Sequence, residues 1–318
     1  MAASTSSDSV ELKRPPIGWA ARLRKLIQPI VLLGPSGLWL LLLLVMPTLL
    51  ITEISLVPNL RPEDPIANYS FANYIHIFEG FGLSFQNSFP FVSVEGVYIR
   101  VILRTFYFGI GATVLCLLLG FPVAYWIAIM SPQRWRNLFL VVFVLPLWTS
   151  SLLRAYAWIS ILRPTGVLNT LLGFAHLPTL DFLHRDVAVF IGLSYSFLPY
   201  MVLILYASLE KLDRRLLEAA ADLGAAPSET FWKITVPQTM PGITAGCLLV
   251  FITSAGDFVN PELLGPPSMT IPRLIYNQFL TVRNWGFGSA LSMILILGVS
   301  LAIALLIKYG DRNAETLS

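Results

Sequence analysis

Charged residues are scarce in this sequence: they make up 12% of its 318 residues, whereas apolar residues make up 56% and mean hydropathy is +0.72. Soluble domains carry about 25% charged residues. Because so few charges cannot cover a surface in water, the composition excludes a soluble enzyme, a nucleic-acid-binding protein and a disordered chain. It predicts a protein whose surface faces lipid.

Cysteine and histidine are also rare. Cys116 and Cys247 lie in apolar runs and are interpreted as small hydrophobic residues. His76, His176 and His184 lie in polar segments without the spacing of metal ligands. The sequence also lacks the pattern Gly-x-x-x-x-Gly-Lys-Ser/Thr, a phosphate-binding loop, and shows no nucleophile–base pair. We therefore expect no metal or cofactor and no ATP hydrolysis by this chain: a non-catalytic subunit.

Long runs without charge dominate the chain, the first of them from Leu26 to Thr52. A membrane-spanning helix needs about 20 apolar residues, and this run is too long for the core of a cleaved signal peptide. The same criterion predicts an all-α membrane protein with six spans. Their approximate ranges are 28–54, 101–130, 137–162, 187–209, 241–264 and 286–308.

The distribution of Lys and Arg predicts the orientation of these spans. With the N-terminus in the cytoplasm, thirteen of the 21 fall in inside segments and five in outside loops. This excess favours cytoplasmic termini at both ends. The predicted parts are an N-terminal tail 1–27, a six-helix domain 28–308 and a C-terminal tail 309–318. Within the domain, 57–97 forms an extracytoplasmic cap and 210–240 a cytoplasmic loop.

The cytoplasmic loop has an amphipathic pattern. Apolar residues recur at helical spacing over 210–223, and Gly224 is expected to end this helix. Pro227 is expected to begin a second short helix that Pro237 ends. Two short helices joined at a glycine favour a rigid surface that binds another protein. The alternative is a loop that packs only on its own chain at the membrane interface.

One motif in this loop distinguishes the two interpretations. Its residues are Glu218, Ala219, Ala220, Gly224, Ile234 and Pro237, with Val236 before the proline. Their spacing resembles the EAA signature of permease subunits of ATP-binding-cassette (ABC) importers, in which leucine usually precedes the proline. The resemblance implies the fold of a type I importer transmembrane domain, with this loop as the coupling helix that contacts an ATPase subunit. Phe231 and Trp232 are expected to anchor its second helix.

The same resemblance implies the partners: ATP-binding-cassette ATPase subunits, a second permease subunit in a heterodimer, an extracytoplasmic substrate-binding protein and the lipid bilayer. It implies a bacterial inner membrane and gives no role to nucleic acid. The segments 57–97 and 265–285 are the expected docking surface for the binding protein.

Residues 145–158 and 256–265 resemble the spermidine/putrescine branch of this family, which implies a polyamine cargo. Carboxylates pair with ammonium groups, and aromatic rings attract cations. The candidate cargo path therefore consists of acidic and aromatic residues of spans three to five: Asp257, Glu262, Trp148, Tyr156, Tyr195 and Tyr200.

Several alternatives remain at this stage. Arg154 is expected to form a structural ion pair with Asp257 or Glu262; alternatively, these two acids contact the cargo. Aromatic residues also mark membrane interfaces, and Arg100 and Arg104 are expected to extend toward the interface. The cargo is alternatively another organic or inorganic ion. In a different class, the chain is a secondary carrier or a channel that needs no ATPase.

Overall fold

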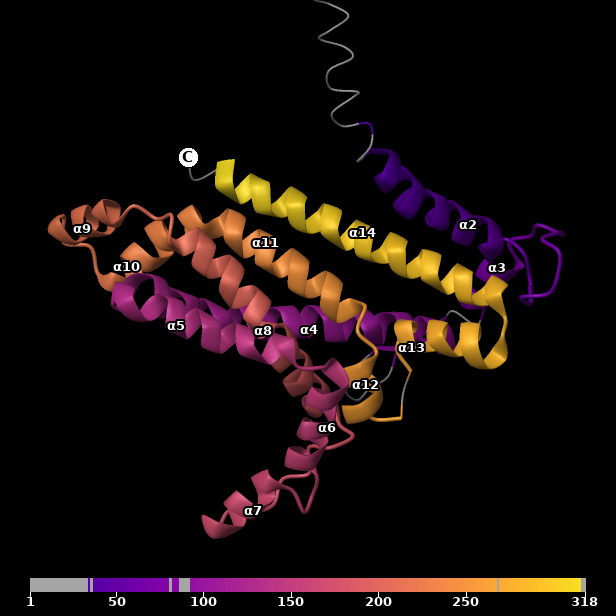
Figure 1. The fold of residues 1–318 in the computed structure, drawn as a ribbon, viewed down its shortest axis with the longest axis horizontal. Coiled ribbons are helices and arrows are strands. Elements are labelled where there is room, and N and C mark those ends of the chain that lie inside the picture. The colour runs from indigo at the N-terminus through magenta and orange to yellow at the C-terminus, as the bar shows by residue number, and fades with distance from the viewer. Residues whose placement is uncertain (1–33, 35–36, 80–81, 86–91, 268, 316–318) are drawn as a thin grey trace, which may run out of the picture. The chain divides into compact units, whose positions relative to one another are not determined.

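The computed structural model describes the chain except for residues 1–33, 35–36, 80–81, 86–91, 268 and 316–318 (Figure 1). The chain forms two compact units, Met1–Ile51 and Thr52–Ser318. The described part of the first unit is a helix that begins at Gly37 and includes the π-turn η1 (Leu41–Val45). It continues as α2 (Met46–Ser55), whose last residues belong to the second unit.

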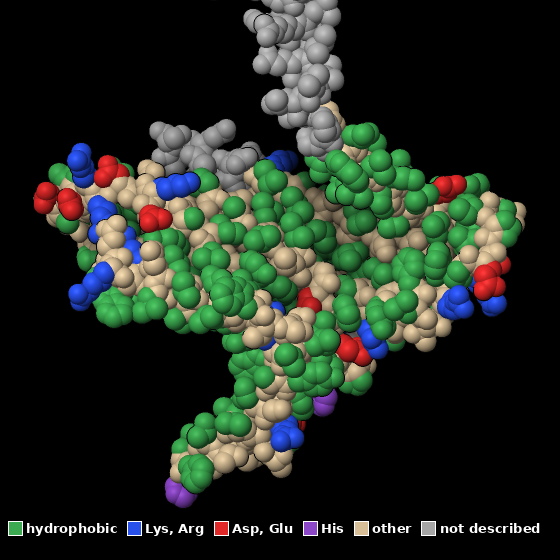
Figure 2. Space-filling model, in the orientation of Figure 1, with side chains coloured by type: hydrophobic (Ala, Val, Ile, Leu, Met, Phe, Trp, Pro, Cys, Tyr) green, Lys and Arg blue, Asp and Glu red, His purple; other side chains and the backbone are tan. Residues whose placement is uncertain are grey.

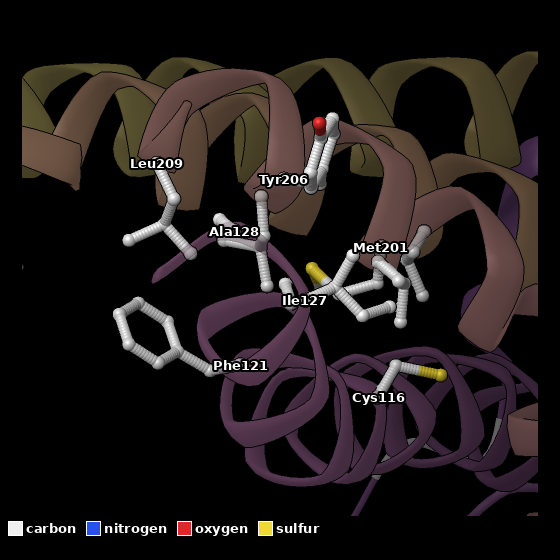
Figure 3. Close-up of a cluster of buried hydrophobic side chains, with 11 residues drawn as sticks. Cys116, Phe121, Ile127, Ala128, Met201, Tyr206 and Leu209 are labelled. Atoms are coloured by element: carbon white, nitrogen blue, oxygen red, sulfur yellow. The ribbon is translucent and has the colours of Figure 1, made fainter. Parts of the chain in front are cut away.

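Three long helices pack against one another in the core of the second unit. They are α4 (Val97–Tyr125), α8 (Asp186–Leu209) and α11 (Val236–Ala255). The π-turn η2 (Trp126–Met130) extends α4, and near it buried side chains of all these elements form one apolar cluster. Figure 3 labels seven of its members: Cys116, Phe121, Ile127, Ala128, Met201, Tyr206 and Leu209.

A second apolar cluster joins α3 (Ala72–Phe78), α13 (Ile271–Tyr276) and α14 (Trp285–Glu315). The π-turn η5 (Asn277–Val282) connects the last two. Buried Asn73 of α3 donates hydrogen bonds to the carbonyls of Ser55 and Val57, at 2.9 and 3.2 Å, and so holds the chain that follows α2.

The described part of the predicted cap 57–97 is folded. Besides α3 it contains an antiparallel hairpin of β1 (Gly82–Phe85) and β2 (Val92–Glu95), with Gly82 opposite Glu95. These are the only strands in the described ranges. All other regular elements there are helices, as the predicted all-α class requires.

The third predicted span, 137–162, is not one helix. The helix α5 (Gln133–Val144) with the 3-10 turn η3 (Leu145–Trp148) meets α6 (Ser151–Leu162) and α7 (Val167–Phe174) at an angle of 95°. Pro146 lies in η3 and cannot donate a backbone hydrogen bond. The sequence predicted a span here but not this break.

Within the described residues, five helices are long and apolar enough to cross a membrane, and the bent pair adds a sixth span if its halves count as one. The predicted count of six is confirmed in this form. The helix α14 continues to Glu315, into the predicted tail 309–318, while the predicted tail 1–27 lies outside the described residues. The five ranges are Gly37–Ser55, Val97–Met130, Asp186–Leu209, Pro227–Ala255 and Trp285–Lys308.

The fifth span differs from its predicted range, 241–264. The helix begins earlier, at Pro227, and passes through α10 (Pro227–Thr230) and the π-turn η4 (Phe231–Thr235) into α11. It ends at Ala255, and α12 (Val259–Leu264) is a separate short helix. The helix α9 (Arg214–Asp222) lies between α8 and α10.

Pro237 does not end the second helix of the loop, contrary to the prediction. In the π-turn before it, the N–H of Val236 bonds to the carbonyl of Phe231, five residues back. This wider turn gives the proline ring the room that a regular α-turn would deny it. As a result the last two motif residues, Ile234 and Pro237, lie in the same continuous helix as the fifth span.

Glycine allows α8 and α11 to approach closely. A Cβ added at Gly242 of α11 would overlap the side chain of Ser208 in α8. Small residues at such crossings let helix backbones pack closely in a membrane. The separation of these two helices therefore depends on Gly242.

We predict that Gly242→Val lowers the stability of the protein by about 1–3 kcal/mol, because the added atoms force α8 and α11 apart. Thermal unfolding in detergent measures the effect. Gly173→Val is the matched control, since a Cβ at Gly173 meets nothing within 4 Å. Equal unfolding temperatures for the two variants would contradict the role of this crossing.

Candidate functional site

The EAA segment, residues 211–237, has the turn that the sequence predicts. Its first helix, α9, ends at Asp222, and Gly224 follows with a φ of 82°. The N–H of Gly224 bonds to Ala221 O at 2.9 Å, and that of Ala225 to Ala220 O at 3.0 Å. This pattern is typical of a helix that ends at a glycine in the left-handed conformation. The prediction that Gly224 ends the helix is confirmed.

The start of α9 is also fixed by a local contact. The carboxylate of Asp213 accepts a hydrogen bond from the N–H of Arg215 at 3.0 Å, as an N-cap residue does. In α10, Pro227 occupies the first turn, as predicted, and Glu229 pairs with Lys233 at 2.9 Å on the exposed surface. Such an exposed pair contributes little to stability. The segment thus has two helices with defined ends.

Three of the six motif residues of the EAA segment, Glu218, Ala219 and Gly224, are exposed. Glu218 and Ala219 are exposed, and Glu218 has no ion pair or hydrogen bond within the described part of the chain, whereas Ala220 is buried. Two large apolar side chains are also exposed: Leu223 at 89% and Trp232 at 67%. Figure 2 shows charged side chains gathered over α9 and α10. An apolar surface with charged neighbours is typical of a site that binds another protein.

The two predicted anchors of the second helix differ. The ring of Phe231 packs edge-on against Phe121, with centroids 5.5 Å apart, and against Tyr125, at 5.9 Å. Trp232 contacts Phe231 but otherwise remains open to solvent. Ile234 and Pro237 are half-buried. Phe231 therefore connects the segment to α4.

A second group of predicted residues lies where α6, α8 and α12 meet. The carboxylate of Asp257 accepts a hydrogen bond from the Asn260 side chain at 2.7 Å, and others from the N–H groups of Val259 and Asn260. The Asn260 amide also lies 3.5 Å from the hydroxyl of Ser196, beside Tyr195 in α8. Asp257 thus caps α12, a role that the sequence did not reveal.

Arg154 stabilises the break between α5 and α6. Its Nη1 donates hydrogen bonds to the carbonyls of Pro146 and Thr149, at 2.7 and 3.0 Å. Arg154 and Asp257 form no ion pair. Glu262 instead pairs with Arg273 at 2.8 Å. The suggested ion pair of Arg154 with either acid is therefore absent.

The predicted aromatic residues are distributed over three places. Tyr195 packs edge-on against Trp158 at 5.5 Å and lines a cavity of about 320 Å³ with Arg154 and residues of α6. Tyr200 packs against the first apolar cluster. Trp148 and Tyr156 are 81% and 56% exposed.

Glu262 lies apart from these aromatic residues. With Arg273 and His184 it lines another cavity, of about 660 Å³. Of the predicted path, Asp257 and Tyr195 lie beside the contact between Asn260 of α12 and Ser196 of α8.

Arg104 has a charged partner that the sequence did not reveal. It forms an ion pair with Asp186, at the start of α8, and its guanidinium lies 5.1 Å from the centre of the Phe108 ring. Sequence reasoning also missed Arg273 and Asn260. The ion pair of Arg104 had one signal in the sequence. Asp186 stands directly before a long uncharged run, and an acid at the end of a span commonly has a basic partner.

These features define a class: a multi-pass membrane protein with the fold of a type I ABC importer transmembrane domain and an exposed EAA segment. Residues 120–312 match the sequence model of a family described as the binding-protein-dependent transport system inner membrane component. The chain belongs to this family.

Relatives extend this assignment over most of the sequence. The spermidine/putrescine transport system permease protein PotB of Haemophilus influenzae is 37% identical over 284 residues, 88% of this chain and 92% of that protein. PotB of Escherichia coli is 41% identical over 214 residues, 66% of this chain and 77% of that protein.

Among solved structures, a bacterial alginate ABC transporter bound to its periplasmic protein has a similar chain. The two chains have a TM-score of 0.68 and 19% identity over 92% of this chain and 98% of that one. At this identity the likeness concerns the fold.

Proposed function

We propose that this chain is a permease subunit of an ATP-driven importer for polyamines such as spermidine and putrescine. It forms half of the translocation path and hydrolyses no ATP itself. The observation that carries the proposal is the identity of 37% with a spermidine/putrescine permease over 88% of the chain. The exposed motif residues of the EAA segment support the second half of the proposal, dependence on a separate ATPase.

The proposal includes the remaining subunits and the orientation. Two ATPase subunits bind the EAA segments on the cytoplasmic side of a bacterial inner membrane, and a different permease subunit completes the path. A substrate-binding protein docks on the outer side, over residues 57–97 and 265–285. Both termini of this chain lie in the cytoplasm, as the Lys and Arg distribution favours.

In this mechanism, ATP binding draws the ATPase subunits together and displaces the EAA segments. Because η4 and α11 continue α10 as one helix, displacement of the segment moves the fifth span directly. The spans then rotate as rigid bodies and expose the path to the loaded binding protein. Hydrolysis returns the spans and releases the cargo into the cytoplasm.

For the cargo, Asp257 offers the best-placed carboxylate, because Glu262 already has a basic partner. Asp257 accepts hydrogen bonds but forms no ion pair within the described residues, so its charge remains available to an ammonium group. Tyr195, near the same junction, presents an aromatic ring, to which cations are attracted.

Purification of the complex tests the function as a whole. We expect the chain, extracted from membranes, to co-purify with an ATPase, a second permease and a binding protein. In proteoliposomes, the complex should take up labelled spermidine only with ATP, and unlabelled putrescine should compete. Uptake of labelled spermidine without any ATPase, or no competition by polyamines, would contradict the proposal.

Gly224→Val tests the coupling segment. Because a Cβ at Gly224 meets nothing within 4 Å, the cost comes from the backbone at φ 82° and amounts to about 1–2 kcal/mol. We expect ATPase association to weaken by about tenfold. Gly224→Asn is the control, since asparagine tolerates this conformation and should retain association. If both variants bind the ATPase equally well, the turn is not required for coupling.

Asp257→Asn separates the cargo role of Asp257 from its role as a cap. Asparagine can still accept hydrogen bonds at the start of α12 but has no charge. If Asp257 pairs with cargo, its loss should raise the KM for spermidine by about tenfold while the complex assembles normally. Wild-type KM values for Asp257→Asn, together with poor assembly of Asp257→Ala, would leave only the structural role.

A further inference from the structure

The three core helices are connected to the EAA segment in different ways. The helix α8 ends at Leu209, a few residues before α9 begins at Arg214. The helix α11 is continuous with α10. Both are therefore attached to the segment through the chain itself. The third core helix, α4 with its extension η2, lies more than eighty residues earlier in the sequence, so any attachment to the segment must come from side chains.

One such attachment is a hydrogen bond from Arg214. Its Nη2 donates to the carbonyl of Ala128, in η2, at 2.9 Å. The last carbonyls of a helix have no partner within the helix, and its C-terminal end carries a partial negative charge. A guanidinium can donate hydrogen bonds to these carbonyls, and its positive charge is attracted to the partial negative charge. Arg136 likewise donates from its Nε to the carbonyl of Ser131, the residue after η2, at 3.2 Å.

Phe231 provides a second attachment, from the other arm of the segment, through its contacts with Phe121 and Tyr125. Arg214 and Phe231 lie on opposite sides of the turn at Gly224 in sequence and contact the same end of α4 and η2. The two contacts therefore fix the orientation of the segment relative to α4, one by a directional hydrogen bond and one by packing.

We propose that Arg214 is a positioning residue that makes α4 move together with α8 and α11 when the EAA segment is displaced. The proposal rests on the function proposed above. Without the bond to Ala128, the segment still moves the two helices that continue it in the chain, but α4 follows less completely. ATP is then hydrolysed without the full opening of the path, so fewer cargo molecules cross the membrane per ATP.

The experiment uses the complete complex in proteoliposomes, with spermidine uptake and ATP hydrolysis measured on the same vesicles. Arg214→Ala should reduce uptake per ATP by about tenfold, while ATPase retention and the hydrolysis rate stay near wild type. Arg214→Lys keeps a charged donor and should retain most of the wild-type uptake per ATP. Arg215→Ala is the matched control, because it removes the same charge from α9 without removing the bond to Ala128.

Several results would overturn the proposal. They are an unchanged ratio in Arg214→Ala, an equal loss in Arg215→Ala, no recovery in Arg214→Lys, and loss of ATPase subunits from the Arg214→Ala complex. The last result would assign Arg214 to the ATPase contact itself. If the Arg214→Ala protein does not accumulate, Arg214→Gln replaces it. We expect Arg214→Gln to give an uptake per ATP between the values of wild type and of the full tenfold loss. A wild-type uptake per ATP would contradict the proposal. Failure of the proposed function is distinguishable, because the wild-type complex would then show no ATP-dependent spermidine uptake.

Discussion

The close crossing of α8 and α11 at Gly242 sets the geometry on which the rest of the molecule depends. These two helices lead directly into and out of the EAA segment, so their separation determines the distance between its two ends. The turn at Gly224 then closes the segment with a left-handed residue, which glycine adopts without steric cost. A shift of either helix would therefore move the exposed surface that carries Glu218 and Trp232.

Much of this arrangement can be predicted from the sequence, because hydrophobic length and glycine conformation are local properties. The uncharged runs predicted the spans, and Gly224 and Pro227 marked the turn between the two helices of the segment. The prediction failed at Pro237 and at the break after Trp148. In both places the effect of a proline depends on whether the preceding turn widens or tightens, and sequence spacing does not reveal which.

The candidate cargo site was less predictable than the segment, because its polar residues choose partners across the fold. Glu262 pairs with Arg273 and Arg104 with Asp186, and neither partner follows from helical spacing. Asp257 is a local case, since it caps the helix that begins two residues later. A half-buried acid in such a position has a structural role whether or not it also binds cargo, so only variants that keep the cap can reveal a second role.

The π-turn η4 contains Ile234 of the EAA motif and connects α10 to the long helix α11. A turn of this kind holds one residue more than an α-helical turn, so deleting a single residue from Phe231–Thr235 would restore regular helix. Because the wider turn accommodates that residue, the deletion would leave the helix before it facing nearly the same way, but it would place Pro237 in a regular α-turn, where its ring clashes with the carbonyl four residues back. The extra residue of η4 therefore keeps Pro237 compatible with one continuous helix without changing the direction in which the exposed surface of the segment points.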